Sequence, residues 1–104
     1  MKKENLIIQT AINTTDSDGY VVQDWADAVT LKGVMLPYGQ QLALKEYGYD
    51  APVKYRVFTF RKNSAIKVGA RVNVRGLFLF VVYIADYGKV QDILLNTEVG
   101  GKGG

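Results

Sequence analysis

Residues 68–90 read V-G-A-R-V-N-V-R-G-L-F-L-F-V-V-Y-I-A-D-Y-G-K-V, and this stretch decides the fold. Its first part, residues 70–75, alternates Ala, Val and Val with Arg, Asn and Arg, a period of two that is typical of a strand with one buried and one wet face. Arg75 and Gly76 then form a turn, because glycine tolerates a positive φ. The chain returns through residues 77–85 without a polar residue. We therefore predict a β-hairpin with one very apolar strand.

This apolar strand must be covered on both of its faces. Its residues, 77–85, are too few to span a bilayer as a helix, which takes about 20 residues. The β-branched and aromatic residues at 81–84 favour a strand over a buried helix. In a small chain the second cover comes either from the protein's own helix and loops or from another subunit.

The composition excludes several kinds of chemistry. The chain has no cysteine and no histidine, which removes thiol nucleophiles, disulfides, most zinc sites and every triad with an imidazole base. Its glycines match no dinucleotide-binding or phosphate-binding loop, and its aspartates near turns are best explained as solvated surface charge. We therefore expect no enzymatic activity, no cofactor and no metal.

Length and charge bound the organisation of the chain. The 104 residues predict a single domain over residues 1–98, followed by a disordered glycine-rich tail at 99–104. Polar residues interrupt the apolar run behind the Met-Lys-Lys start, so we expect no signal peptide, no membrane contact and synthesis in a cytoplasm. The net charge of +3, with both signs mixed, favours only mild attraction to anionic partners.

Several shorter segments add strands and turns to this picture. Residues 6–8 predict a short strand or helical turn, and the small polar residues 13–19 predict an exposed loop after it. The lone tryptophan, Trp25, is expected to cap one end of the core. Residues 61–64 predict a polar turn, and residues 90–97 predict the last strand.

Two further strands carry irregularities. Residues 28–35 alternate as a strand, within which Gly33 marks a bulge or a close backbone approach, and Pro37 ends it because proline donates no ladder hydrogen bond. Residues 53–61 also read as a strand, but the apolar positions change parity at residues 57 and 58. That change predicts a bulge there or burial on both faces.

The alternation of apolar and polar residues that is typical of strands stops between residues 37 and 52. Residues 40–47 are good helix formers and Gly48 is placed to end them, which predicts a helix of about two turns. So short a helix must dock on the sheet or on a neighbour, or else be mobile. The whole chain thus predicts a mainly β fold, a small β-barrel of five to six short strands with one short helix in an inserted loop at 37–52.

Basic residues between 54 and 75 raise the alternative of nucleic-acid binding. They are interleaved with Tyr55, Phe58 and Phe60, as an OB-like or SH3-like barrel would present to a single strand. The modest net charge favours a solvated face over binding. The side chains placed for contact with DNA or an acidic partner are Arg61, Lys62 and Lys67.

Several segments together resemble a known family. They are W-A-D at 25–27, V-T-L-K-G-V-M-L-P-Y-G at 29–39, L-A-L-K-E-Y-G at 42–48, and the run from I-K-V-G-A-R to A-D-Y-G-K at 66–89. This ensemble resembles the small minor capsid proteins of tailed phages and prophages of Gram-positive bacteria, in the head-closure or stopper group of the head-tail connector. The resemblance implies a small β-barrel with an inserted loop, copies of which form a ring that holds packaged DNA between portal and tail.

The resemblance also implies sites and partners. Its partners would be further copies in a homo-oligomeric ring, the connector proteins above and below, and DNA in weak contact, with a location in the virion after assembly in the host cytoplasm. The implied partner or gate loop comprises Tyr38, Leu42, Leu44, Tyr47 and Tyr49. Residues 77–84 are implied to be a core or ring-interface strand, and the ring-interface residues within it would be Leu77, Leu79, Val81 and Tyr83.

Overall fold

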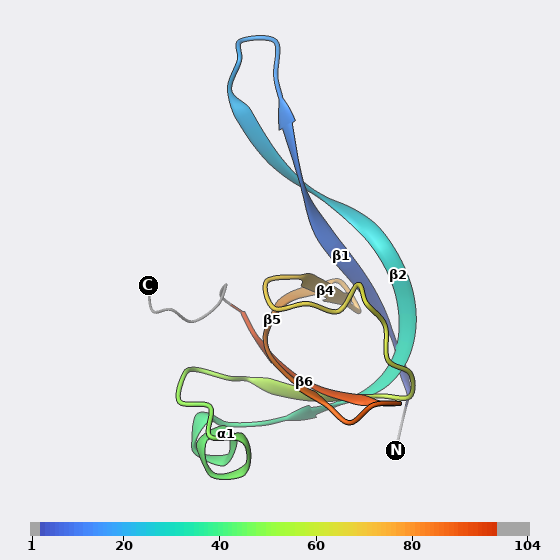
Figure 1. Ribbon diagram of the computed structural model, residues 1–104, viewed down its shortest axis with the longest axis vertical. Helices are drawn as coiled ribbons and strands as arrows, with labels where there is room; N and C mark the ends of the chain where they lie inside the picture. Colours follow the sequence, from blue (N-terminus) through green and yellow to red (C-terminus); the bar gives the residue numbers. More distant parts are fainter. Residues whose placement is uncertain (1–2, 98–104) are drawn as a thin grey trace.

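A computed structural model describes residues 3–97, which form one antiparallel sheet that closes on itself (Figure 1). The strands run in the order β1-β2-β3-β6-β5-β4, and β4 pairs back on β1 through residues 71–73. The prediction of a mainly β barrel with one short helix is confirmed. The elements are β1 (Glu4–Thr15), β2 (Val21–Pro37), α1 (Gln40–Tyr47), β3 (Tyr55–Thr59), β4 (Arg71–Val74), β5 (Leu77–Asp86) and β6 (Gln91–Asn96).

The core fills the inside of the closed sheet. In β4, Val72 and Val74 are buried while Arg71 and Asn73 are half-exposed, which confirms the predicted alternation. Each fully buried aliphatic side chain contributes about 1.5–3 kcal/mol relative to an exposed one. The core cluster consists of Leu6, Ile8, Val57, Ile66, Ala70, Val72, Val74, Leu79, Val81, Ile93 and Leu95.

The turn between β4 and β5 forms as predicted. Arg75 has a φ of 53° and Gly76 a φ of 80°, so both central residues occupy the left-handed region that a two-residue hairpin turn with matching twist requires. The side chain of Asn73 accepts a hydrogen bond from the Gly76 amide at 3.1 Å. This turn sets the register in which Val74 faces Leu77.

The apolar strand β5 changes face at an irregularity. Before it, Leu79 and Val81 point into the barrel, and the register with β6 then shifts between Val81 and Tyr83. As a result, Val82 and Tyr83 both contribute to the outer cluster beside α1, and Ile84 again packs against the core. For this half of β5, the protein's own helix supplies the second cover.

The first two strands are much longer than the sequence predicted. The loop expected at residues 13–19 is wrong, because β1 continues to Thr15, which pairs with Val21, and only residues 16–20 form the turn. Residues 11–24 are exposed, so no buried face marks them as strands in the sequence. These residues form strands because the backbones of β1 and β2 pair by hydrogen bonds, and exposed polar side chains do not interfere with that pairing.

Gly33 lies where two strands come close together, as predicted. A Cβ atom on Gly33 would lie 2.8 Å from the Leu6 Cδ1 atom and 2.8 Å from the Phe58 carbonyl oxygen. The register shift between β1 and β2 lies elsewhere, between Ile8 and Gln9. Pro37 is the last residue of β2, which confirms where that strand ends.

Of the two alternatives predicted near residues 57 and 58, the bulge is wrong, and the strand is instead at least half-buried on both faces. β3 pairs with β2 and with β6 without a register shift, and Val57 and Thr59 are both buried. Phe58 lies on the outer face, half-buried, with the Arg56 guanidinium carbon 4.1 Å from its ring centroid. The arginine over this ring explains how an aromatic residue occupies the outer face of a regular strand.

Two expectations concern the ends of the chain and membranes. The glycine-rich tail at 99–104, for which disorder was predicted, lies outside the described residues. Within residues 3–97, no helix is long and apolar enough to cross a membrane.

Candidate interaction surfaces

The helix α1 forms as predicted and ends at Gly48. Gly48 has a φ of 71°, and its amide donates to the Leu44 carbonyl at 3.0 Å. The Tyr49 amide donates to the Ala43 carbonyl at 3.2 Å, so the last carbonyls of the helix are satisfied by a left-handed glycine cap.

This helix docks on the outside of the barrel over β5 and β6. Ala43 is fully buried and packs with Val53, Val82 and Leu94. Tyrosine rings surround this contact, with centroid separations of 6.2 Å for Tyr38 and Tyr47, 5.7 Å for Tyr47 and Tyr83, and 5.3 Å for Tyr49 and Tyr83. The sequence left three alternatives for so short a helix, which are docking on its own sheet, docking on a neighbour, or mobility. The structure shows the helix docked on its own sheet.

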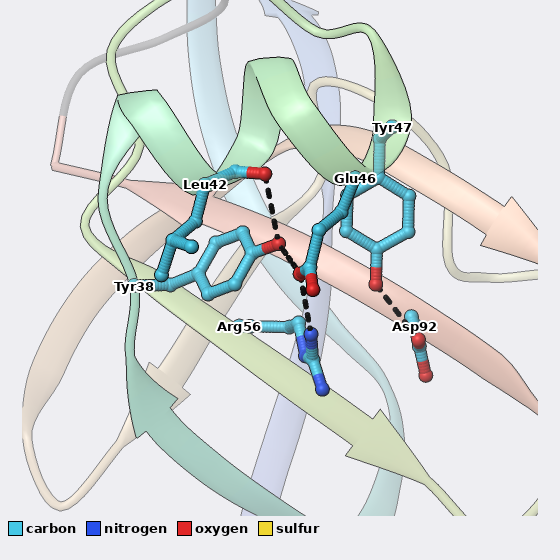
Figure 2. Close-up of polar contacts among 6 residues, drawn as sticks. All are labelled: Tyr38, Leu42, Glu46, Tyr47, Arg56 and Asp92. Atoms are coloured by element: carbon cyan, nitrogen blue, oxygen red, sulfur yellow. Dashed lines mark hydrogen bonds and ion pairs between the residues drawn. The ribbon is translucent and has the colours of Figure 1, made fainter.

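A polar network ties the helix to the strands beneath it (Figure 2). The Tyr47 hydroxyl donates to Asp92 Oδ2 at 2.9 Å, and Arg56 Nη1 donates to Glu46 Oε1 at 3.2 Å. The Tyr38 hydroxyl also contacts the Glu46 carboxylate. Burial, aided by the hydrogen bond to Asp92, raises the pKa of Tyr47.

The predicted partner or gate loop therefore presents only part of its apolar surface. Tyr38, Tyr47 and Tyr49 are half-buried and pack within the outer cluster. Leu42 and Leu44 point outward with 48% and 50% of their surface exposed. These two leucines are the residues of the loop that remain available to a partner.

The predicted ring-interface residues do not share one surface. Leu79 and Val81 are 0% exposed inside the barrel, so they are core residues rather than interface residues. The alternation of the strand turns them inward, and sequence alone does not say which face of a doubly apolar strand is outside. Leu77 is 40% exposed, whereas Tyr83 is half-buried beside the helix.

The three basic residues singled out in the sequence are also dispersed. Arg61 lines a pocket of about 250 Å³ together with Thr30, Leu31, Lys32 and Phe60. Lys62 instead forms an ion pair with Asp86 at 2.7 Å, and this lysine holds the pKa of Asp86 below its usual range. Lys67 lines a different pocket, beside Thr10, Ala11 and Val68.

The most exposed feature is one that sequence reasoning missed. Residues 10–27 of the β1–β2 hairpin, hereafter the arm, extend beyond the barrel to the end of the molecule opposite α1 (Figure 1). The molecule measures 47 Å along this axis against 29 and 26 Å across it. The arm exposes large apolar residues, which are Ile12 (42%), Tyr20 (70%), Val21 (72%) and Val22 (44%).

The tip of the arm is an ordered turn. Asp16 Oδ1 accepts hydrogen bonds from the amides of Asp18 and Tyr20, each at 2.9 Å, and Gly19 has a φ of 87°. The dipeptide Asp18-Gly19 between polar, partly alternating segments is the hairpin signal from which the arm could have been found.

The base of the arm is braced against the barrel. The Trp25 ring lies 5.9 Å from the Phe80 ring, and the Arg71 guanidinium lies 4.9 Å from Trp25 and 4.2 Å from Phe78. Arg71 Nε also donates to Gln9 Oε1 at 2.7 Å. Trp25 therefore belongs to an outer brace, and the prediction that it caps the core is wrong, since the core cluster does not include it.

No arrangement typical of a metal site is present in the described part of the chain. Residues 3–97 contain no group of three or more Asp or Glu side chains placed to hold an ion.

Comparison with known proteins places this fold among solved structures. The chain matches no protein family model and no curated protein. It is similar to the solution structure of protein SF1141 from Shigella flexneri 2a, with a TM-score of 0.71, 22% identity and coverage of 89% of each chain. It is also similar to a chain in the virion of a native gene transfer agent particle, with a TM-score of 0.58, 11% identity and coverage of 91% of this chain and 93% of that one. At these identities the comparisons establish a shared fold.

Proposed function

We propose that this protein is a structural, non-enzymatic component of a tailed-phage or prophage particle, in the connector between head and tail. The observation that carries the proposal is that 91% of the chain shares its fold with a chain of a gene transfer agent virion. The resemblance of the sequence to head-closure proteins points the same way.

In the proposed connector, copies of the barrel form a ring between portal and tail. A cyclic ring joins two different patches of each subunit, so each copy must offer two unlike surfaces. The arm and the barrel are such a pair. Leu42 and Leu44 on α1, at the opposite end from the arm, offer a further surface for a connector protein above or below.

DNA would pass such a ring as cargo. The exposed lysines and arginines favour weak, salt-sensitive contact with phosphates, which suits a channel through which DNA must slide. No enzymatic step is needed for this role.

The proposal is tested by deleting the gene in a strain that produces the particles. We expect DNA-filled or leaking heads without tails, restored to complete particles by the gene in trans, and we expect mass spectrometry to find the chain in purified particles. Complete tailed particles that lack the chain would refute the proposal.

A single-strand-binding barrel is the second candidate, supported by one observation. Phe60 is 50% exposed and lies beside Lys32 and Arg61, with Lys3 Nζ 4.8 Å from its ring centroid. An exposed aromatic ring among cations is a stacking platform for a base. The salt dependence of oligonucleotide binding, treated in the Discussion, discriminates the two.

A further inference from the structure

The charges of this protein are segregated between the arm and the rest of the chain. The arm contains Asp16, Asp18, Asp24 and Asp27 and no lysine or arginine, so it carries −4. Because the whole chain carries +3, the remainder carries +7. The two parts of one molecule thus have opposite and complementary charge.

The tip of the arm combines acid with exposed apolar surface. Tyr20 and Val21 are 70% and 72% exposed, the largest exposures among the large apolar residues described. Asp16 is engaged in holding the turn, whereas the Asp18 side chain is exposed beside it. A partner for this tip must therefore offer an apolar contact and a nearby cation.

The pocket that contains Arg61 offers both. Phe60, half-exposed, supplies the apolar surface, and Lys32 and Arg61 line the same pocket of about 250 Å³. Among residues 3–97, neither of these two cations forms an ion pair, and no carboxylate lines the pocket. The pocket is thus complementary to the tip in both polarity and charge.

The tip cannot reach the pocket of its own molecule. Tyr20 and Thr30 are separated by ten residues, nearly all in the paired strand β2, which is roughly 33 Å at about 3.3 Å per residue. The brace at the base of the arm, formed by Trp25 and Arg71, opposes folding back. The contact must therefore join two molecules.

We propose that the tip of one copy, residues 16–21, docks on the pocket lined by Lys32, Phe60 and Arg61 of a second copy. Because the two patches differ, each copy can dock its tip on one neighbour while its pocket binds the tip of another. Such a heterologous contact propagates into a ring or an open chain. The inference rests on the proposed function, because it names the contact through which copies of the proposed connector protein would join.

The absence of cysteine allows a direct test by disulfide trapping. The variant Ser17→Cys with Thr30→Cys places one thiol at the tip and one in the pocket. Mild oxidation of the purified, folded variant at low salt is expected to give a ladder of dimers, trimers and longer species. Mixing the two single variants should give cross-linked heterodimers only, because each copy then carries one of the two thiols.

A matched control separates this contact from random collision. Ser17→Cys with Gln41→Cys moves the second thiol to the exposed surface of α1, at the opposite end of the molecule. A ladder no stronger than that of the control would overturn the inference. Circular dichroism establishes that both variants are folded, so that a weak ladder reports the contact.

Charge reversal gives an independent measurement. Arg61→Glu in the trapping variant should reduce the ladder about tenfold, because it places a carboxylate opposite Asp18 of the docking copy. Adding Asp18→Lys should restore the ladder, because it makes the two charges opposite again. Lys89→Glu, which makes the same change of charge outside the pocket, should have little effect. Equal losses from Arg61→Glu and Lys89→Glu would mean that net charge, and not this contact, drives association.

The same double-cysteine variant in particles distinguishes the two proposals. A chain that is present in particles without the cross-link would overturn this contact and leave the connector role standing. If the purified chain gives a ladder but the chain itself is missing from particles, the contact is supported and the connector role is overturned.

Discussion

The hydroxyl of Tyr47 lies 2.9 Å from the Asp92 carboxylate, a hydrogen bond that spans 45 residues of sequence and fixes the end of α1 to β6. Asp92 is 9% exposed, so its oxygen depends on this donor. A buried acceptor left without a partner costs about 1–3 kcal/mol. We predict that Tyr47→Phe lowers the free energy of unfolding by that amount in urea denaturation.

The control for this prediction is Tyr49→Phe. Tyr49 packs on Tyr83 in the same cluster, but its hydroxyl makes no side-chain hydrogen bond among those found in residues 3–97. An equal loss in both variants would show that packing, and not the bond to Asp92, holds the helix.

Alkaline pH should weaken the fold through the same residue. The pKa of Tyr47 is raised above the ordinary value of 10.0, first by burial and then by its hydrogen bond to Asp92. Above pH 10 the unfolded chain loses this proton while the folded chain keeps it, so the stabilisation is complete below pH 10 and is lost as pH rises further. The difference in stability between the parent and Tyr47→Phe should therefore shrink above pH 10, as measured by urea denaturation at successive pH values.

Absorbance near 295 nm supplies the direct readout of this titration. Burial also raises the pKa of Tyr38 and Tyr49, so the folded protein should show tyrosines that ionise late. Tyr47→Phe should remove part of that late phase and leave the rest. An unchanged late phase would contradict the assignment to Tyr47.

Gly33 should tolerate no side chain. Gly33→Ala would place a Cβ atom 2.8 Å from both the Leu6 side chain and the Phe58 carbonyl, and the backbone contact cannot yield as a side chain can. We predict destabilisation of about 1–3 kcal/mol, typical of overpacking, measured by denaturant unfolding. Gly39→Ala is the control, because nothing lies within 4 Å of its Cβ position, and a larger loss there would contradict this explanation.

The arm should be dispensable for folding. Ala11 and Trp25 face each other in the hairpin, so replacing residues 12–24 with Asn-Gly joins two register partners by a favoured turn and keeps the brace at Trp25. Because the deleted residues are all exposed and none belongs to the core cluster, we expect an amide spectrum of the barrel close to that of the parent. Loss of dispersion in that spectrum would mean that the arm stabilises the barrel.

Oligonucleotide binding should be weak and should disappear near physiological salt, because it would rest on dispersed charges. Tyr55 and Phe58 are half-buried, whereas Phe60 is 50% exposed and is the one of the three rings that a base could stack on. Fluorescence anisotropy with a labelled single strand measures the salt dependence. Micromolar binding that survives salt and is lost in a folded Phe60→Ala variant would favour the single-strand-binding alternative.

The parts of the fold that sequence could predict are those with a strong local signal. The hairpin at Arg75-Gly76 and the helix ending at Gly48 each have a glycine in the left-handed region next to a clear periodic pattern. The arm has a left-handed glycine, Gly19, in its turn but no periodic pattern beside it, because residues exposed on both faces carry no hydrophobic period. The strands of the arm can be recognised only from their pairing with each other, which the sequence of either strand alone does not show.

The sites were harder to predict than the fold. Sequence distinguishes apolar from polar residues, but it does not show which face of a doubly apolar strand such as β5 lies outside. It therefore leaves core and ring interface open for Leu79 and Val81, which fill the core. It also gave no reason to bring Thr30 and Lys32 beside Arg61, because that neighbourhood depends on the close pairing of β2 with β3.

The arm leaves strand edges open that the barrel itself has closed. In the described sheet, β1 pairs with β4 only at Ile7–Gln9, and β2 pairs with β3 only from Gly33 onward, so each has one neighbour along the arm. Open edges of this kind invite two arms to zip together into aggregates. Four aspartates on each arm make that approach repulsive. The charge that, in the proposed contact, draws the arm of one copy to the barrel of another should therefore also keep free copies from aggregating through their arms.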